Sequence, residues 1–322
     1  MINSIEFYRT SGGQAIPISS ASVTLDTDSM AWQLTASLPR ISDARMLNGE
    51  QVTLSINGHS WQFVIDSWSE SRSYSQRGAT VTGRSLSAKL SASLSLKRSH
   101  TEQAARTMIQ LAEAELPDGW TIDWQAADWL VDAAAWSYAS QSPIEAIQTL
   151  STAAGSFIYP ALNTQLLTVK PLFNALPWAL SNIAPDIYVP DSIITTLGSQ
   201  YQRKQQADGV WVSGGSAGVS VFVKRTGTSG SNQLSDVTNS LITTTAAARA
   251  LGGTLLAQSL PYNTDTLQMP ISSDTGLLTP GLVVETDSGI GYARGIKVSA
   301  SVNNNRAVSV NQQVEVDRYE VA

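Results

Sequence analysis

Strict alternation of apolar and polar residues is the feature of this sequence that most limits its fold. It runs through WQLTASL at 32–38, QVTLSIN at 51–57 and WQFVIDSW at 61–68. Because side chains of a strand point alternately to the two faces of a sheet, this period of two predicts strands with one buried face. Asn57-Gly58 joins two of these segments, and this pair is typical of a two-residue hairpin turn. We therefore expect residues 1–98 to form a small β-barrel or sandwich.

A helical pattern replaces the alternation after residue 98. Ser99 stands three residues before Glu102, the spacing of a capping box, and apolar residues then recur at helical spacing as far as Leu116. A second box opens the segment SPIEAIQTLSTAAG at 142–155, where a proline occupies the first helical position and a glycine supplies the stop. The sequence therefore predicts two capped helices in this region.

Strand-like segments return from about residue 185, interrupted by a helix predicted near 241–258 that two adjacent glycines weaken. The predicted fold class is α+β, mainly β, with two small β-barrel domains separated by an α+β insert. The predicted boundaries are residues 1–98 for the first barrel, 99–184 for the docking insert and 185–322 for the second barrel.

Charged side chains are scarce in this chain, and hydroxyl side chains replace them. Lys, Arg, Asp and Glu make up 14% of the residues, against about 25% in an ordinary globular domain. The chain holds 43 serines and 28 threonines, and its 42% of hydrophobic residues can form a core. The net charge of −6 argues against a dedicated binder of nucleic acid or anionic membranes, because such proteins need clustered Lys and Arg.

The residues needed for several kinds of chemistry are missing. Cysteine is absent, and His59 and His100 are the only histidines. Disulfides, thiol nucleophiles and a multi-histidine metal centre within one chain are therefore excluded. Neither a GxSxG nor a GxxxxGK[ST] motif occurs. We expect no catalytic, cofactor-binding or metal-binding residues, and an architectural protein rather than an enzyme.

The sequence also shows no pattern of a secretory signal and no apolar stretch long enough to cross a bilayer. We therefore expect a protein made in a cytoplasm, without a membrane segment.

Trp120, Trp124, Trp129 and Trp136 fall within 17 residues and alternate with aspartates. One interpretation is a packed connection or an interface, since aromatic residues concentrate at interface cores. We favour it because the last three tryptophans do not share one strand face. The alternative is a carbohydrate-binding or glycan-cleaving site at 118–136, with rings that stack on sugars and carboxylates that act on them.

Three segments, taken in order, carry a resemblance to a known family. They are VTGRSLSAKL at 81–90, SPIEAIQTLSTAAGSFIYP at 142–160 and LLTPGLVVETDSGIGYARGIKVSASV at 277–302. They resemble, respectively, the Gly-Arg segment that closes the first barrel, the capped helix before an aromatic strand, and the late strand-turn-strand unit of phage baseplate hub proteins. That family includes the late control protein D and the hub of Mu-like phages. The tryptophan cluster departs from its pattern.

The resemblance implies a homotrimer at the tail tip or baseplate of a virion, made in the host bacterial cytoplasm. Two similar barrels from each copy would form a ring of six that stacks on the tail tube. The implied partners are the tail tube or distal tail protein, central spike or fibre proteins and the tape measure protein. DNA would pass through the lumen without specific binding.

Overall fold

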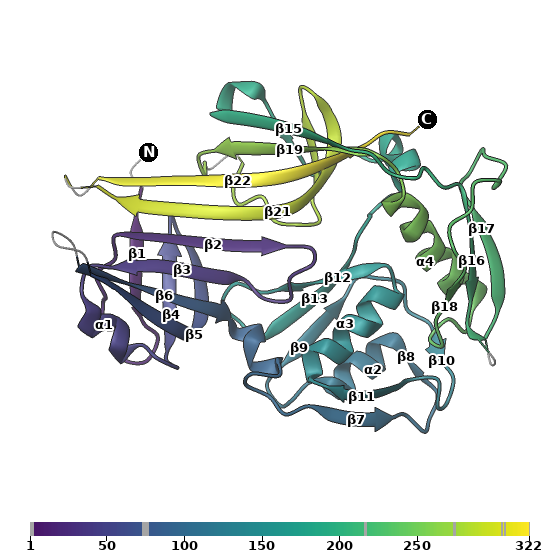
Figure 1. Cartoon of the computed structure of the whole chain (residues 1–322), viewed down its shortest axis with the longest axis horizontal. Helices are drawn as coiled ribbons and strands as arrows, with labels where there is room; N and C mark the ends of the chain where they lie inside the picture. Colours follow the sequence, from purple (N-terminus) through teal and green to yellow (C-terminus); the bar gives the residue numbers. More distant parts are fainter. Residues whose placement is uncertain are drawn as a thin grey trace.

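The computed structural model describes residues 3–72, 77–215, 218–272, 275–303, 305 and 307–321. Within these residues β-strands dominate, and four α-helices and three short 3-10 helices join them (Figure 1). This composition confirms the predicted α+β, mainly β fold class.

The alternating segments near the N-terminus form a block of hairpins that pair in the order β1-β4-β5-β6-β3-β2. Asn57 and Gly58 have φ angles of 49° and 86°, and a turn of this kind requires positive φ at both positions. The elements are β1 (Ile5–Arg9), β2 (Ser20–Asp26), β3 (Gln33–Leu38), α1 (Ile41–Met46), β4 (Gln51–Ile56), β5 (His59–Arg72) and β6 (Arg77–Ser85).

A second block of strands continues the same sheet in the order β21-β22-β19-β15. The blocks join where β2 pairs antiparallel with β21, from Ser20 opposite Ser301 to Asp26 opposite Gly295. A branch of β20 and β14 pairs with β21. The elements are β14 (Ile187–Val189), β15 (Thr196–Gln202), β19 (Tyr262–Met269), β20 (Val283–Thr286), β21 (Gly289–Val302) and β22 (Val308–Tyr319).

One hydrophobic core lies under both blocks. Val23 and Leu34 of the first block and Val298 and Val314 of the second belong to it, and each is at most 1% exposed. The first and last thirds of the chain therefore bury their apolar faces together. The domain boundaries at 98 and 184, and the closure of each block into a barrel, stay predictions.

The insert contains two helices and several short sheets. Helix α3 begins after Ser142, as predicted, with the backbone N–H of Ser142 donating to Glu145 Oε2 over 2.8 Å. Gly155 follows the helix with a φ of 65°, which is the expected left-handed stop. The elements of the insert and of the segments that flank it are η1 (Leu86–Leu90), β7 (Arg98–Thr101), β8 (Arg106–Thr107), α2 (Met108–Glu115), β9 (Thr121–Trp124), β10 (Leu130–Val131), β11 (Ser137–Gln141), α3 (Pro143–Ala153), β12 (Ser156–Pro160), β13 (Leu166–Pro171), η2 (Pro177–Asn182) and η3 (Asp191–Ile193).

The first helix of the insert begins later than predicted. Residues 98–101 form β7, which pairs with β11, so the prediction of a helix start at Ser99 was wrong. The capping box that operates lies at Thr107 and Gln110, whose side chains and backbone N–H groups bind each other reciprocally. Ser99 and Glu102 have the same spacing as Thr107 and Gln110. Residues 98–101 are nevertheless a strand, because their backbone pairs with β11, about 40 residues further along the chain.

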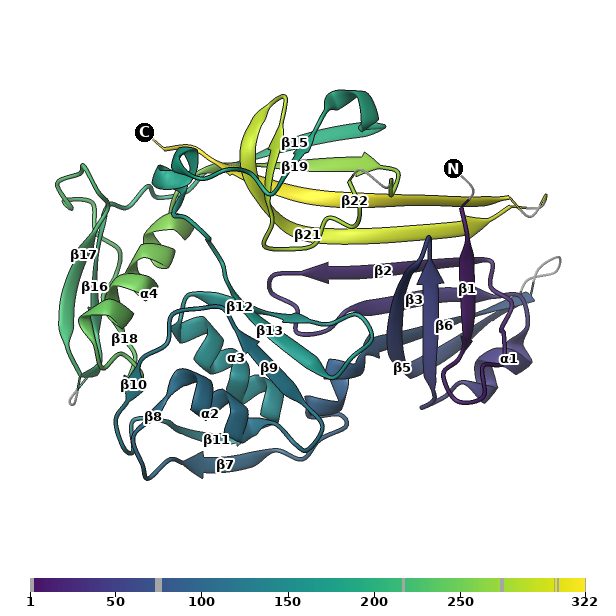
Figure 2. The same cartoon turned by 180° about the vertical axis from the view of Figure 1, so that it is seen from behind.

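A second core joins the insert to residues 209–258, which the sequence assigned to the second barrel. Val212 and Ile242 from this segment are buried in the same cluster as Ile147 and Leu150 of α3. Figure 2 shows α4 beside β16 and β17, at the opposite end of the molecule from β1. The predicted helix is confirmed but begins at Thr245. The elements are β16 (Gly209–Ser213), β17 (Ser220–Lys224), β18 (Val237–Thr238) and α4 (Thr245–Gln258).

Candidate functional site and assembly surfaces

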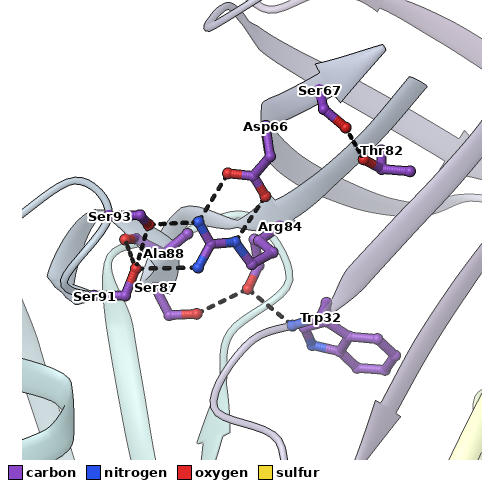
Figure 3. Close-up of polar contacts among 10 residues, drawn as sticks. Trp32, Asp66, Ser67, Thr82, Arg84, Ser87, Ala88, Ser91 and Ser93 are labelled. Atoms are coloured by element: carbon purple, nitrogen blue, oxygen red, sulfur yellow. Dashed lines mark hydrogen bonds and ion pairs between the residues drawn. The ribbon is translucent and has the colours of Figure 1, made fainter. Parts of the chain in front are cut away.

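The end of β6 forms a polar junction between the sheet and the insert. Strand β5 carries a bulge at Asp66, and this extra residue meets Arg84 of β6. Arg84 Nε donates to Asp66 Oδ2 over 2.7 Å, and Arg84 Nη2 donates to Asp66 Oδ1 over 2.8 Å (Figure 3). These hydrogen bonds raise the pKa of the guanidinium above its ordinary value, although partial burial opposes the change.

The other donors of Arg84 bind the loop that leads into the insert. Nη1 donates to Ser91 Oγ over 3.1 Å, and Nη2 donates to Ser93 Oγ over 2.7 Å. The neighbouring Ser85 Oγ accepts a hydrogen bond of 3.0 Å from the backbone N–H of Trp32. Arg84 and its neighbour in the chain, Ser85, therefore fix β5, β6 and the start of the insert relative to one another.

Gly83 completes the junction by allowing a close approach of backbones. A Cβ atom at this position would lie 2.6 Å from the carbonyl oxygen of Val64, closer than real Cβ contacts allow. Each residue of the Gly-Arg-Ser segment therefore has a physical role.

The four clustered tryptophans lie in or against the core of the insert. Trp129 and Trp136 are 7% and 3% exposed, and Trp129 Nε1 donates to the carbonyl oxygen of Leu241 over 2.7 Å. Trp120 and Trp124 are half-buried and pack against the same core. A sugar platform needs rings that are open to solvent, so Trp129 and Trp136 do not supply one. Whether this cluster also forms an interface stays a prediction.

The polar residues of this region make structural contacts. Asp128 Oδ1 accepts a hydrogen bond from the backbone N–H of Ile109. His100 Nε2 lies 3.7 Å from Glu102 Oε2. Across the described part of the chain, no three acidic or histidine side chains are placed to hold a metal ion. In the same part, no helix is long and apolar enough to span a bilayer.

Strand β15 is an edge strand with an uncovered apolar side. Among the described residues it pairs only with β19. Leu197 stands opposite the buried Leu267, so it faces the core side of the sheet, yet it is 49% exposed. Tyr201, four residues further on the same side, is 53% exposed. Edge strands of this kind can pair with another chain.

The solvent side of the sheet carries two complete rows of small polar side chains across six strands. Every member is exposed or half-buried, and their direct pairing places them on one face. We call this set the hydroxyl face, and it consists of Ser69, Thr80, Ser37, Ser20, Ser301 and Ser309 in one row and Ser67, Thr82, Thr35, Ser22, Ser299 and Asn311 in the other.

Neither surface was among the residues singled out from the sequence. The hydroxyl face has a sequence signal, because Ser and Thr fill the polar positions of alternating segments such as SASVTLD and VSASV. The exposure of β15 has no such sequence signal, because the segment IITTLGSQ has the same mixture of apolar and polar residues as a strand with one buried face.

Comparison with known proteins yields matches in structure alone. No family model and no curated protein matches the sequence. A tail protein from Neisseria meningitidis MC58 is similar with a TM-score of 0.71 and 14% identity, over 98% of this chain and 96% of that chain. The 43 kDa tail protein of prophage MuSo2 from Shewanella oneidensis gives a TM-score of 0.68 and 13% identity, over 98% of each chain.

A component of the type VI secretion system of E. coli is also similar, with a TM-score of 0.57 and 12% identity, over 98% of this chain and 76% of that chain. That protein itself exhibits structural similarity to T4 bacteriophage tail proteins. This chain therefore has the fold of phage tail proteins, from its first strands to its last.

Proposed function

We propose that this chain is a structural, non-enzymatic subunit of a phage tail tip. Three copies form a hub that joins the tail tube to the tip proteins and surrounds the channel through which DNA leaves the virion. The observation that carries the proposal is the end-to-end likeness to the Neisseria tail protein, which covers 98% of this chain and 96% of that one.

The free edges of the large sheet support assembly from identical copies. Strand β15 ends the sheet on one side, and β5 beyond Ile65 pairs only with β6 among the described residues. Two different edges on one subunit favour a head-to-tail contact, and such contacts close into rings when the rotation fits. The exposed Leu197 and Tyr201 provide apolar area that a neighbouring copy would cover.

The proposed partners follow from the position in the tail. They are the tail tube or distal tail protein on one side of the hub, the central spike or fibre proteins on the other, and the tape measure protein in the channel. We place the protein in the virion, at the tail tip or baseplate, and propose the late control protein D and Mu-like hubs as its family.

The test is the oligomeric state of the purified chain, alone and co-expressed with its neighbouring tail proteins. We expect a molar mass of three chains by light scattering and ring-shaped particles with a central hole in electron micrographs. A chain that stays monomeric with every neighbouring tail protein contradicts the proposal.

A further inference from the structure

Trp211 of β16 is an exposed tryptophan that lies outside the cluster at 120–136. It is 42% exposed, whereas Val210 and Val212 on either side of it are fully buried against α4. Because successive residues of a strand point to opposite faces, Trp211 stands on the outer face of the small sheet of β16, β17 and β18. Figure 2 shows this sheet at one end of the molecule, with α4 on its inner side.

Phe222 of β17 holds the ring of Trp211 in place. The two residues stand directly opposite each other, with ring centroids 5.2 Å apart and ring planes at 45°. We call this pair the aromatic platform. Phe222 itself fits against two glycines: a Cβ at position 209 would lie 2.6 Å from its Cζ, and a Cβ at position 230 would lie 2.9 Å from its Cε1. No larger residue fits at either position without displacing the ring.

Asp208 fixes the loop that carries Gly230. Its Oδ2 accepts a hydrogen bond of 3.0 Å from the backbone N–H of Gly230, and its Oδ1 accepts one of 2.7 Å from the backbone N–H of Asn232. The platform is therefore ordered before any ligand arrives, so that binding costs little conformational entropy.

Small polar side chains surround the aromatic platform. Those of the outer face and of the neighbouring loop are Ser213, Ser220, Thr238, Ser229 and Ser231. Charges of both signs stand at the border, since Lys224 at the end of β17 and Asp236 just before β18 are exposed. No acceptor among the described residues binds Trp211 Nε1, so this N–H can donate to a ligand.

The apolar area of the aromatic platform is too small for a protein interface. An aromatic side chain can bury about 150–250 Å², so Trp211, at 42% exposure, leaves about 100 Å² open. A stable interface covers about 800 Å² on each partner, more than half of it apolar. Among the described residues of these three strands, no other large apolar side chain is exposed. A single sugar ring, in contrast, is about as large as an indole.

A pyranose ring presents one face of C–H groups, whose partial positive charge suits the negative face of an aromatic ring. Its hydroxyl groups at the edge need hydrogen-bonding partners, which the surrounding serines and threonine provide. We propose that the aromatic platform is a saccharide-binding site, in which a sugar ring stacks on Trp211 and its hydroxyl groups bind Trp211 Nε1 and the polar rim. This inference goes beyond the proposed function, since the assembly contact proposed at β15 does not include the platform.

The probe for this site is a dense array of bacterial, plant and animal saccharides, applied to the purified full chain. Trp211→Ala removes the platform, and Tyr188→Ala is the matched control because it removes a ring that is 50% exposed on β14. We expect the natural chain and Tyr188→Ala to bind the same saccharides, and Trp211→Ala to bind them at least tenfold more weakly. Circular dichroism and the unfolding midpoint should show that all three chains are folded.

Saturation-transfer NMR on the natural chain, with a saccharide found on the array, tests the stacking without any variant. We expect the strongest transfer to the C–H protons on one face of a single sugar ring. Silence across the array, equal binding by Trp211→Ala, or transfer spread evenly over the sugar overturns the proposal. If the array is silent and Trp211→Ala instead loses a neighbouring tail protein, the platform is a protein interface and the proposal is wrong. Light scattering on the same samples reports the trimer separately, so failure here leaves the proposed function standing.

Discussion

Arg84 and Asp66 bind each other through two parallel hydrogen bonds, of 2.7 and 2.8 Å, across a bulge in β5. Such a bidentate pair needs the planar fork of a guanidinium, which an ammonium group cannot reproduce. The same guanidinium reaches Ser91 and Ser93, so the pair fixes the insert as well as the sheet.

We therefore expect Arg84→Lys to lower the free energy of unfolding by about 1 kcal/mol, because the pair is only partly shielded from solvent. Urea denaturation measures this change. Arg45→Lys is the control, since Arg45 makes one bond to Glu70 in a more exposed pair. Equal effects of the two substitutions would contradict a special role for the junction.

Trp129 links the insert to the segment before α4 through its bond to the Leu241 carbonyl oxygen. Trp129→Phe keeps an aromatic ring but removes this hydrogen bond, which we expect to lower the free energy of unfolding by about 0.5–1.5 kcal/mol. The Leu241 carbonyl oxygen keeps its second hydrogen bond, of 3.1 Å from the backbone N–H of Thr243. Trp124→Phe should have a smaller effect, because Trp124 is half-buried and its Nε1 donates to the carbonyl oxygen of Ala127, only three residues away in the chain. A larger effect at Trp124 in urea denaturation would refute this assignment.

The two adjacent glycines of α4 should respond differently to alanine, with a loss of stability at Gly252 and no loss at Gly253. A Cβ at position 252 would lie 2.7 Å from Val223 Cγ2 and 2.8 Å from Val223 Cβ, in contact with a stiff β-branched residue. We expect Gly252→Ala to destabilise the fold by about 1–3 kcal/mol in thermal or urea unfolding.

Gly253→Ala is the matched control, since its Cβ would meet the flexible side chain of Leu176 at 3.1 Å. The gain in helix propensity, about 1 kcal/mol, should then offset the small shift of Leu176. If both variants stabilise the protein, packing of α4 against β17 does not explain Gly252.

The exposed apolar side of β15 should be needed for assembly and not for folding. Leu197→Asp with Tyr201→Asp places charges where a neighbouring copy would pack, so we expect the trimer to be lost while circular dichroism and the unfolding midpoint of the subunit stay unchanged. Gln200→Asp adds a charge to the opposite side of the same strand and should leave the trimer intact. Light scattering decides, and a stable trimer of the double variant would rule out this interface.

The pH dependence of stability should reveal the burial of Asp317. Burial raises the pKa of this carboxyl above its ordinary value of 3.8, and the hydrogen bond from Thr264 and the charge of Arg294 only partly oppose this. A raised pKa means that the folded state binds the proton more tightly, so the contribution of Asp317 to stability falls as pH rises. The stability of Asp317→Asn relative to the natural chain should therefore increase as the pH rises above the ordinary pKa of 3.8.

Asp287→Asn provides a control of opposite sign for this experiment. Hydrogen bonds from Tyr188 and the backbone of Asp191 lower the pKa of Asp287, so its contribution is present above the ordinary pKa of the group and is lost only in acid. The difference between Asp287→Asn and the natural chain should stay flat at neutral pH. A flat difference for Asp317→Asn in urea denaturation would contradict the assignment to Asp317.

Local features were predictable from the sequence because neighbouring residues determine them. The turn at Asn57 and Gly58, the start of α3 after Ser142 and the stop at Gly155 depend on a few adjacent φ angles and backbone hydrogen bonds. The alternating segments identified the strands for the same reason. The false helix start at Ser99 shows the limit, since the same local spacing occurs where a distant strand claims the backbone.

The long-range features depended on the tertiary structure. The pairing of β2 with β21 joins residues that lie hundreds of positions apart in the chain. Among the described residues β15 pairs with β19 alone, which the local sequence does not indicate. The bulge that brings Asp66 to Arg84 and the sharing of a core between the insert and α4 are of the same kind. The sequence by itself determined the strands, the helices and a wealth of serine and threonine. Only the register of the folded sheet gathered those hydroxyl groups on one face, because a face exists only once distant strands are paired.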